Sequence, residues 1–153
     1  MYNEIRQDLR YRSPVNKLNL TFMSNLPKTA FVPVLIIPSN TTDIDFYKNA
    51  LGAIELRRWS NDDGSIHVAE LVIDGAMFHL HEENVTKGSF SPGIYNGVTT
   101  DIGLMVADVD SVMKKAIAAG AKQLNPATDY DYGYRQGDIS DPFGHRWTIE
   151  MVI

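Results

Sequence analysis

The sequence predicts an α+β fold made of two consecutive copies of one unit, a strand followed by a helix and three further strands (βαβββ). Two pairs of glycines carry this prediction. Gly52 and Gly120, which each follow a helical pattern, are 68 residues apart. Gly75 and Gly144, which each lie in a hairpin turn, are 69 residues apart. Because the same order of elements recurs at a nearly constant spacing, we interpret the chain as an internal repeat.

The first unit begins with an apolar strand at residues 31–38. Thr42 is expected to cap a helix over residues 43–51, and Gly52 is expected to end that helix. Three strands are then predicted from their apolar patterns, at residues 55–59, 65–73 and 76–82. The Asp-Gly pair between the last two strands indicates a tight hairpin turn.

The second unit repeats this order. A strand is predicted at residues 101–107, and Asp108 or Asp110 is expected to cap a helix over residues 109–119. A short strand at residues 122–125 then leads into the C-terminal hairpin.

The C-terminal hairpin contains the densest run of specific residues in the chain. Asp141-Pro-Phe-Gly144 predicts a tight turn, because its aspartate can bond the nearby backbone, its proline fixes the second position and its glycine tolerates a positive φ. His145 is expected to cap this turn. Residues 146–152 alternate polar and apolar, which predicts a strand with one buried face, and residues 135–139 are its expected partner.

Alternation along the strands divides their residues between two faces. We expect the sheets to lie side by side, with the helices covering the outer face and a concave inner face left open. The residues expected on the helix-packed face are Leu35, Ile37, Phe78, Leu80, Ile102, Leu104, Val106, Trp147, Ile149 and Met151. The residues expected to face the concavity are Val32, Val34, Ile36, Met77, His79, His81, Asp101, Gly103, Met105, Thr148 and Glu150.

Composition limits the classes of partner. The net charge of −5 and the scattered basic residues argue against nucleic acid, which requires clustered Lys and Arg. The chain contains no cysteine, so disulfides and thiolate metal sites are excluded. No apolar run approaches the ~20 residues of a membrane span, and the N-terminus lacks the pattern of a signal peptide. We therefore expect a cytoplasmic protein that binds neither nucleic acid nor membrane.

The length of 153 residues predicts one domain. We expect this domain to cover residues 31–153, with modules at 31–83 and 100–153 and a Gly-, Ser-, Pro- and Asn-rich linker at 84–99. Residues 1–30 are polar and are expected to form an N-terminal extension. Within it, residues 17–23 alternate and favour a strand, and either Met1 or Met23 could be the true start.

Two strings in these elements resemble the vicinal oxygen chelate superfamily, the group of glyoxalases, bleomycin-resistance proteins and extradiol dioxygenases. They are Phe46-Tyr-Lys-Asn-Ala-Leu-Gly52, and Tyr132-Gly-Tyr-Arg with Asp141-Pro-Phe-Gly-His-Arg-Trp147. The second string is most similar to the PhnB-like branch. The resemblance covers roughly residues 31–153. It implies paired βαβββ modules in a half-open mixed-sheet barrel, completed as a homodimer, with a small-molecule ligand in the concave sheet cavity.

The resemblance also implies where a metal would bind. Metal-using members hold it with four side chains, one from the first and one from the last strand of each module. Those places fall on Val32, His79, Asp101 and Thr148. Val32 has no donor atom, and Thr148 is a poor ligand for a divalent ion. We therefore expect no cofactor and no catalytic metal.

His79 and Asp101 are the candidate catalytic residues. An aspartate beside a histidine raises the pKa of the imidazole and fixes its tautomer, as a general base requires. His81 lies two residues along the same strand and points the same way as His79. The two histidines with Asp101 or Glu150 could instead hold a divalent metal, or all four could be polar cavity residues without a catalytic role.

The other candidates surround the expected cavity. Arg135 could bind an anion at the cavity mouth, or it could be an exposed hairpin arginine. Tyr132 and Tyr134 could line a ligand pocket or simply cover the sheet. The full set of candidate ligand-binding residues is His81, Tyr132, Tyr134, Arg135, Thr148 and Glu150.

Three functions fit these observations. The first is a metal-independent binding protein of the antibiotic-resistance type, the second a metal-dependent lyase, isomerase or dioxygenase with an unusual ligand set, and the third a structural or regulatory dimer. The poor ligand set argues against the second. The polar groups on the concave face argue against the third, because burying polar groups is costly. We favour the first; the identity of the ligand, and whether a reaction is catalysed, do not follow from the sequence.

Overall fold

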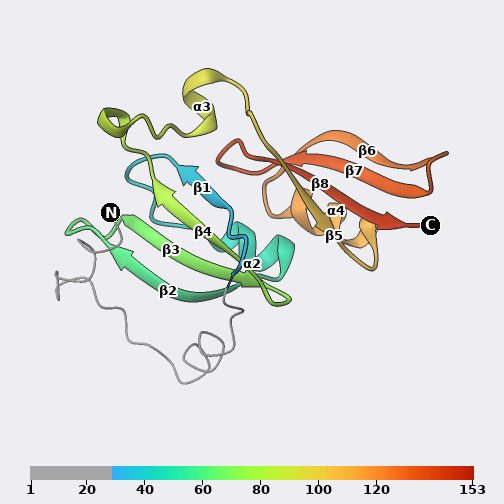
Figure 1. Ribbon diagram of the computed structural model, residues 1–153, viewed down its shortest axis with the longest axis horizontal. Helices are drawn as coiled ribbons and strands as arrows, with labels where there is room; N and C mark the ends of the chain where they lie inside the picture. Colours follow the sequence, from blue (N-terminus) through green and yellow to red (C-terminus); the bar gives the residue numbers. More distant parts are fainter. Residues whose placement is uncertain (1–28) are drawn as a thin grey trace.

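The computed structural model describes residues 29–153, so the strand expected at residues 17–23 lies outside the described residues. The described part contains two four-stranded sheets, with strand orders β1-β4-β3-β2 and β5-β8-β7-β6 (Figure 1). In each sheet, one parallel pair lies beside two antiparallel pairs. The predicted α+β fold of two βαβββ modules is confirmed.

The strands of the first sheet are β1 (Val34–Ile37), β2 (Ile54–Ser60), β3 (Ile66–Ile73) and β4 (Ala76–Glu82). Those of the second are β5 (Asp101–Met105), β6 (Lys122–Tyr130), β7 (Tyr134–Ser140) and β8 (Arg146–Val152). Helix α2 (Asp45–Leu51) follows β1, and α4 (Val109–Ala118) follows β5. The segment between the modules contains a 3-10 helix, η2 (Val85–Lys87), and the short helix α3 (Pro92–Tyr95).

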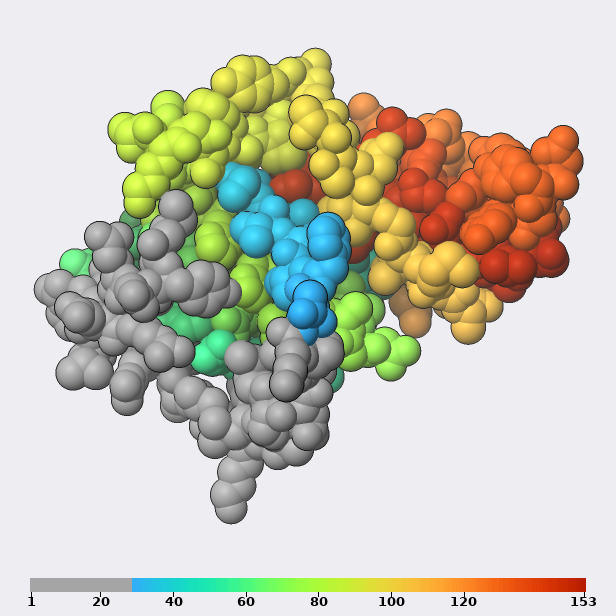
Figure 2. Space-filling model, in the orientation of Figure 1, coloured from blue at the N-terminus to red at the C-terminus, as the bar shows by residue number. Residues whose placement is uncertain are grey.

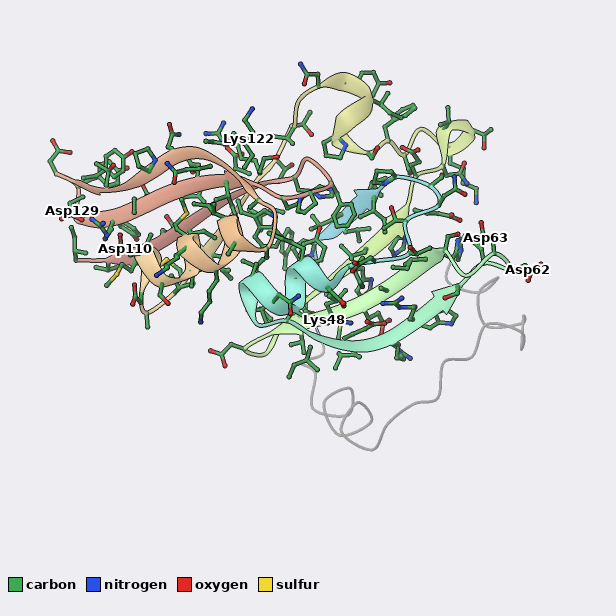
Figure 3. The ribbon with its side chains drawn as sticks, turned by 180° about the vertical axis from the view of Figure 1, so that it is seen from behind. Lys48, Asp62, Asp63, Asp110, Lys122 and Asp129 are labelled. Atoms are coloured by element: carbon green, nitrogen blue, oxygen red, sulfur yellow. The ribbon has the colours of Figure 1, made fainter. Side chains whose placement is uncertain are left out.

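Both long helices lie on the same side of the molecule. Seen from behind, α2 and α4 stand in front of their sheets (Figure 3), so the opposite faces of both sheets turn toward the viewer of Figure 1. The space-filling view from that side shows the linker running along the top edge of the first module before it crosses to the second (Figure 2). Between residues 29 and 153, no helix combines the length and the apolar character that crossing a membrane requires.

Two predicted helix ends are confirmed. Helix α2 is followed by Gly52 in the left-handed conformation, with φ of 69°, which glycine adopts without steric cost. Helix α4 is capped by Asp108, whose carboxylate accepts a hydrogen bond of 2.9 Å from the backbone N–H of Ser111.

The predicted start of α2 is wrong. The helix begins at Asp45, and Ile44 rather than Thr42 occupies the capping position, without a side-chain capping bond. The carboxylate of Asp43 accepts a hydrogen bond of 2.7 Å from the backbone N–H of Asp45. This Asx-type contact satisfies one of the free amides at the start of the helix, so the chain does not need the Thr42 hydroxyl there.

Strand β6 is longer than the predicted strand at residues 122–125, since it continues to Tyr130. Its pairing with β7 shifts register on both sides of Asn125. Each such bulge changes which face the following side chains occupy. The period-two pattern is therefore lost in the sequence although the strand continues.

One apolar core joins the two modules. Tyr47 of α2 is fully buried and contacts the rings of Phe78 in β4 and Trp147 in β8, with centroids 5.5 and 6.2 Å away. Helix α2 also lies against α4. All ten strand residues predicted on the helix-packed face belong to this core or pack against it.

A buried carboxylate fastens the C-terminal turn to the first module. Asp141 Oδ2 accepts hydrogen bonds from the hydroxyl of Tyr47, at 2.8 Å, and from the indole N–H of Trp147, at 3.1 Å. Asp141 Oδ1 accepts the backbone N–H groups of Phe143 and His145, both at 2.9 Å. Burial and the adjacent carboxylate raise the pKa of Tyr47 well above its ordinary value, so its hydroxyl keeps the proton that it donates.

His145 extends this connection to β1 and caps the turn as expected. Its Nδ1 lies 3.1 Å from Asp141 Oδ2, and its Nε2 lies 2.9 Å from the carbonyl oxygen of Ile36. A carbonyl oxygen can only accept, so Nε2 carries a proton and donates it to β1. The turn of the second module is thus hydrogen-bonded both to α2 and to β1 of the first.

Replacing Asp141 should strongly destabilise the fold. Asp141→Ala leaves four donors without their acceptor, and we expect the free energy of unfolding to fall by about 3 kcal/mol or more. Urea denaturation measures this loss. Asp62→Ala is the control, because Asp62 lies exposed on the β2–β3 turn and should change stability little (Figure 3). Equal stability of the two variants would contradict the role given to Asp141.

Gly137 of β7 should not tolerate a side chain. A Cβ at this position would lie 2.9 Å from Met113 Cε of α4 and 3.1 Å from the backbone nitrogen of Ala127. Because the backbone atom cannot move freely, Gly137→Ala should cost about 1–3 kcal/mol. Gly93→Ala is a matched control, since its Cβ meets nothing within 4 Å. Thermal unfolding that ranked Gly93→Ala below Gly137→Ala would refute this packing.

Candidate functional site

Each sheet has one face against its helix and one face that no helix of residues 29–153 covers. We call the helix-free faces the first and the second polar face. The cross-strand register assigns their members. The first polar face contains Val34, Ile36, Arg57, Val68, Glu70, Met77, His79 and His81. The second contains Asp101, Gly103, Met105, Asn125, Thr128, Tyr130, Tyr134, Gln136, Asp138, Arg146, Thr148 and Glu150.

A buried ion pair lies at the centre of the first polar face. Register places His79, Glu70 and Arg57 side by side on three neighbouring strands. Arg57 donates two hydrogen bonds, of 2.5 and 2.8 Å, to the carboxylate of Glu70, which is only 7% exposed. This bidentate contact neutralises the buried carboxylate and fixes its position.

The two histidines of β4 lie parallel beside this pair. The rings of His79 and His81 stack with centroids 5.9 Å apart and an angle of 6° between their planes. His79 Nε2 lies 3.4 Å from Met77 Sδ and 3.9 Å from Glu70 Oε1. His81 Nε2 is buried and has no hydrogen-bond partner among residues 29–153.

Both histidines are held in the neutral form. Burial lowers the pKa of His79 below its ordinary value of 6.5, and this outweighs the opposing charge of Glu70. Burial also lowers the pKa of His81, with a further lowering from the neighbouring histidines His79 and His67. The first polar face therefore offers uncharged imidazoles and a neutralised ion pair among apolar side chains.

The second polar face carries a larger hydrogen-bonded network. Asp138 accepts hydrogen bonds from Asn125 at 2.6 Å, from Thr148 at 2.7 Å and from Arg146 at 3.3 Å. Burial raises the pKa of Asp138, but these three donors outweigh burial and hold the pKa below its ordinary value. Arg146 Nε is buried without a hydrogen-bond partner in the described chain, although Asp101 Oδ1 lies 3.4 Å away.

Tyrosines and Glu150 form the other half of this face. The hydroxyl of Tyr132 donates to Gln136 Oε1 at 2.5 Å, and Gln136 Nε2 donates to Glu150 Oε2 at 2.5 Å. The rings of Tyr130 and Tyr132 stack with centroids 5.1 Å apart, and Tyr134 follows 6.1 Å from Tyr132. The structure thus brings Tyr132, Tyr134 and Glu150 together on one sheet.

The structure does not bring His79 and Asp101 together within one chain. His79 lies on β4 of the first sheet, while Asp101 lies on β5 of the second, where its charged neighbour is Arg146. The cross-strand neighbours of His79 are Val34 on β1 and Glu70 on β3, and Val32 packs against an apolar cluster of Leu56, Val72 and Met77. Hydrogen bonding of His79 to Asp101 is therefore not a contact of the single chain.

Arg135 lies on the helix side of the second sheet, contrary to the expectation that it stands at the cavity mouth. It donates two hydrogen bonds of 2.8 Å to Asp110 of α4 and one of 2.6 Å to Asp129 of β6. Figure 3 shows these two aspartates near the same end of the second module. The hydrogen bond from Arg135 lowers the pKa of Asp110. Two carboxylates thus hold Arg135 away from the polar face.

The sequence prediction missed Arg57, Glu70, Gln136 and Asp138. A signal was present for two of them. Glu70 is the one acidic residue in the apolar run of β3, residues 66–73. Asp138 lies 68 residues after it, which is the spacing of the repeat. Each module therefore places a carboxylate at the centre of its polar face.

The fold and the helix string agree with a known family. A profile of the Glyoxalase/Bleomycin resistance protein/Dioxygenase superfamily matches residues 41–149. The chain belongs to this superfamily. An uncharacterized protein of Mycobacterium tuberculosis strain H37Rv is 35% identical over 127 residues, which are 81% of this chain and 75% of that protein.

Two solved structures show the same fold. The crystal structure of TioX from Micromonospora sp. ML1 matches with a TM-score of 0.60 and 25% identity over 81% of this chain and 100% of that chain. A gene product of Arabidopsis thaliana matches with a TM-score of 0.60 and 26% identity over 80% of this chain and 98% of that chain.

Two of the four residues at the metal-binding places that the resemblance implies do not fit a divalent ion. Val32 offers no donor atom, and the hydroxyl of Thr148 already donates to Asp138. Stable divalent sites use imidazole, carboxylate or thiolate donors. Across residues 29–153, no three or more His, Asp or Glu side chains are grouped as a metal would require. We therefore assign no metal-dependent step to this chain.

The neutral histidines should make stability depend on pH. Because their folded pKa values lie below the ordinary 6.5, the unfolded chain takes up protons first as the pH falls. Stability is therefore fully present above pH 6.5 and declines as the pH falls through that value. Urea denaturation of the wild type and of His79→Gln/His81→Gln between pH 5 and 8 measures this effect. A constant difference between the two proteins across that range would contradict it.

Proposed function

We propose that this chain is a homodimeric binding protein for a small organic molecule, which it holds between polar faces without a catalytic metal. The observation that carries the proposal is the pair of buried nitrogen atoms without hydrogen-bond partners in residues 29–153. His81 Nε2 lies on the first polar face and Arg146 Nε lies on the second. Buried polar atoms in proteins are nearly always paired, so both faces favour an additional partner.

The dimer is proposed because each chain supplies two half-sites. The polar faces belong to separate sheets, and β1 and β5 are edge strands of those sheets within residues 29–153. Val34 on β1 is 48% exposed and Met105 on β5 is 55% exposed, so apolar surface borders both edges. A cavity formed by the first polar face of one chain and the second polar face of its partner would cover these edges and bring His79 near the partner's network.

Binding is favoured over catalysis by the state of the candidate groups. Among residues 29–153, the carboxylate nearest to His79 is that of Glu70 at 3.9 Å, which is too far to orient His79 as a general base. Glu70 is held by Arg57, and Thr148 is held by Asp138. Groups that are held in fixed hydrogen bonds suit recognition of a ligand. We further propose that the chain belongs to the PhnB-like branch, because its C-terminal string is similar to that branch.

A thermal-shift screen of small organic molecules, with and without divalent metals, is the first test. We expect ligands that raise the melting temperature without added metal, because binding to the native state stabilises it. Stabilisation that requires zinc, nickel, iron or manganese would overturn the metal-free assignment and favour a metal-dependent enzyme. Failure of every compound in the screen would overturn the binding function.

Mixed dimers test whether the cavity is shared between chains. His81→Ala damages only the first polar face and Arg146→Ala only the second, so each homodimer should bind a screened ligand about tenfold more weakly or worse. A heterodimer of the two variants contains one cavity with both changes and one with neither. We expect it to bind one ligand per dimer at wild-type affinity, measured by titration calorimetry.

The opposite results are also clear. If each cavity lay within one chain, every chain of the heterodimer would carry a change and no wild-type site would remain. If both variant homodimers bound as tightly as the wild type, the polar faces would not be the site. Asp62→Asn, on an exposed turn of the first sheet, is the control for effects of preparing the mixed dimers.

A further inference from the structure

The charges of the polar faces are paired with one exception. Arg57 is bound by Glu70, and Arg146 lies between Asp138 and Asp101. Glu150 has no cationic partner within the described chain. Its recorded hydrogen bond comes from the neutral amide of Gln136. A half-buried carboxylate without a counter-charge is costly, and a cation that arrives with a ligand would remove that cost.

The hydrogen bonds around Glu150 leave one of its oxygens available. The hydroxyl of Tyr132 can donate only to the carbonyl oxygen of Gln136, which orients the amide so that its N–H points at Glu150 Oε2. Burial, followed by the nearby Tyr130, raises the pKa of Tyr132, so this hydroxyl remains a donor. Glu150 Oε1 accepts no hydrogen bond from the part of the chain that the structure describes.

The available oxygen lies over the edge strand of the sheet. A Cβ on Gly103 would lie 3.1 Å from Glu150 Oε1. The carboxylate therefore reaches from β8 over β5, into the space that a side chain at Gly103 would fill. Gly103 is exposed. Glu150 Oε1 is therefore presented at the open edge rather than within the sheet.

Aromatic surface lies on the far side of Gln136 from this carboxylate, on the same face of the sheet. Tyr132, which is linked to Glu150 through Gln136, is 59% exposed, and its stacked neighbour Tyr130 is 38% exposed. Exposed aromatic rings beside a carboxylate attract a cation both through the ring faces and through the charge. An anion finds no free positive charge on the second polar face, because Arg135 is held on the helix side and the charge of Arg146 is balanced by Asp101 and Asp138, which leaves only its Nε as a single donor for a neutral acceptor.

We propose that Glu150 binds a positively charged nitrogen of the ligand, and that Tyr130 and Tyr132 contact the ligand's aromatic or apolar part. The ligand class is thus an aromatic or amphipathic amine. This inference rests on the proposed binding function, since it concerns the same polar face. It differs from the anionic ligand that Arg135 would bind if it stood at the cavity mouth.

Three probes of similar shape and different charge test the inference: tryptamine, tryptophol and indole-3-propionate. Their dissociation constants are measured by NMR titration with the wild-type protein at pH 7. We expect tryptamine to bind about tenfold more tightly than tryptophol, because a charged hydrogen bond is stronger than a neutral one. Indole-3-propionate should bind most weakly. Equal or tighter binding of the propionate would overturn the inference.

Two variants test whether Glu150 causes the preference for tryptamine. Glu150→Gln keeps the shape of the side chain and removes its charge, so it should lose the preference for tryptamine over tryptophol. Asp131→Asn removes a charge from an exposed residue of the same tyrosine-rich turn and should keep the preference. If both variants lost it equally, a diffuse negative potential rather than Glu150 would be responsible. If Glu150→Gln kept it, Glu150 would not be the anchor.

The inference and the proposed function fail in different ways. A protein that binds another compound from the screen but not tryptamine would refute the amine class and keep the binding function. A ligand identified in the screen that lacks a cationic nitrogen would do the same. Melting temperatures of the two variants that match the wild type confirm that any change in binding is local.

Discussion

The buried carboxylate of Asp141 requires donors, and the donors come from both halves of the chain. Tyr47 reaches it from α2, Trp147 from β8 and two backbone amides from its own turn. Buried charge is stable in a protein only where such contacts replace water. The consequence is geometric. The two modules must meet at this turn, with their helices together on one side, and the two helix-free sheet faces are then positioned through the shared core rather than through hydrogen bonds between the sheets.

This arrangement separates the residues that stabilise the fold from those available for recognition. The core takes one set of alternate strand residues, together with α2 and α4. The other set forms the polar faces, where Glu70 and Asp138 occupy corresponding places in the two modules. Their partners differ, because Glu70 is bound by Arg57 of β2 whereas Asp138 is bound by Arg146 of β8. The two modules therefore share one backbone fold, but different side chains surround the central carboxylate of each polar face.

The sequence predicted the element order, the strand faces and the turn at Asp141, because each depends on local patterns. It predicted the start of α2 wrongly, since a nearby carboxylate can replace a predicted cap. His79 and Asp101 were paired through their sequence positions, but they lie on different sheets, and contacts between modules leave no local pattern. The alternative that placed Arg135 at the cavity mouth failed for a different reason. Arg135 is four residues before the buried Ile139 on β7, so alternation already placed it on the helix side.

Gly103 has a further consequence that concerns size rather than charge. The absent side chain leaves room for the carboxylate of Glu150 to extend over β5. A methyl group there would meet Oε1 at 3.1 Å and force the carboxylate back by a few tenths of an ångström. The reach of this carboxylate is thus set by a residue that offers no functional group of its own. In the proposed binding function, a substitution at this position changes selectivity through steric adjustment, while the interacting groups and the stabilising core stay the same.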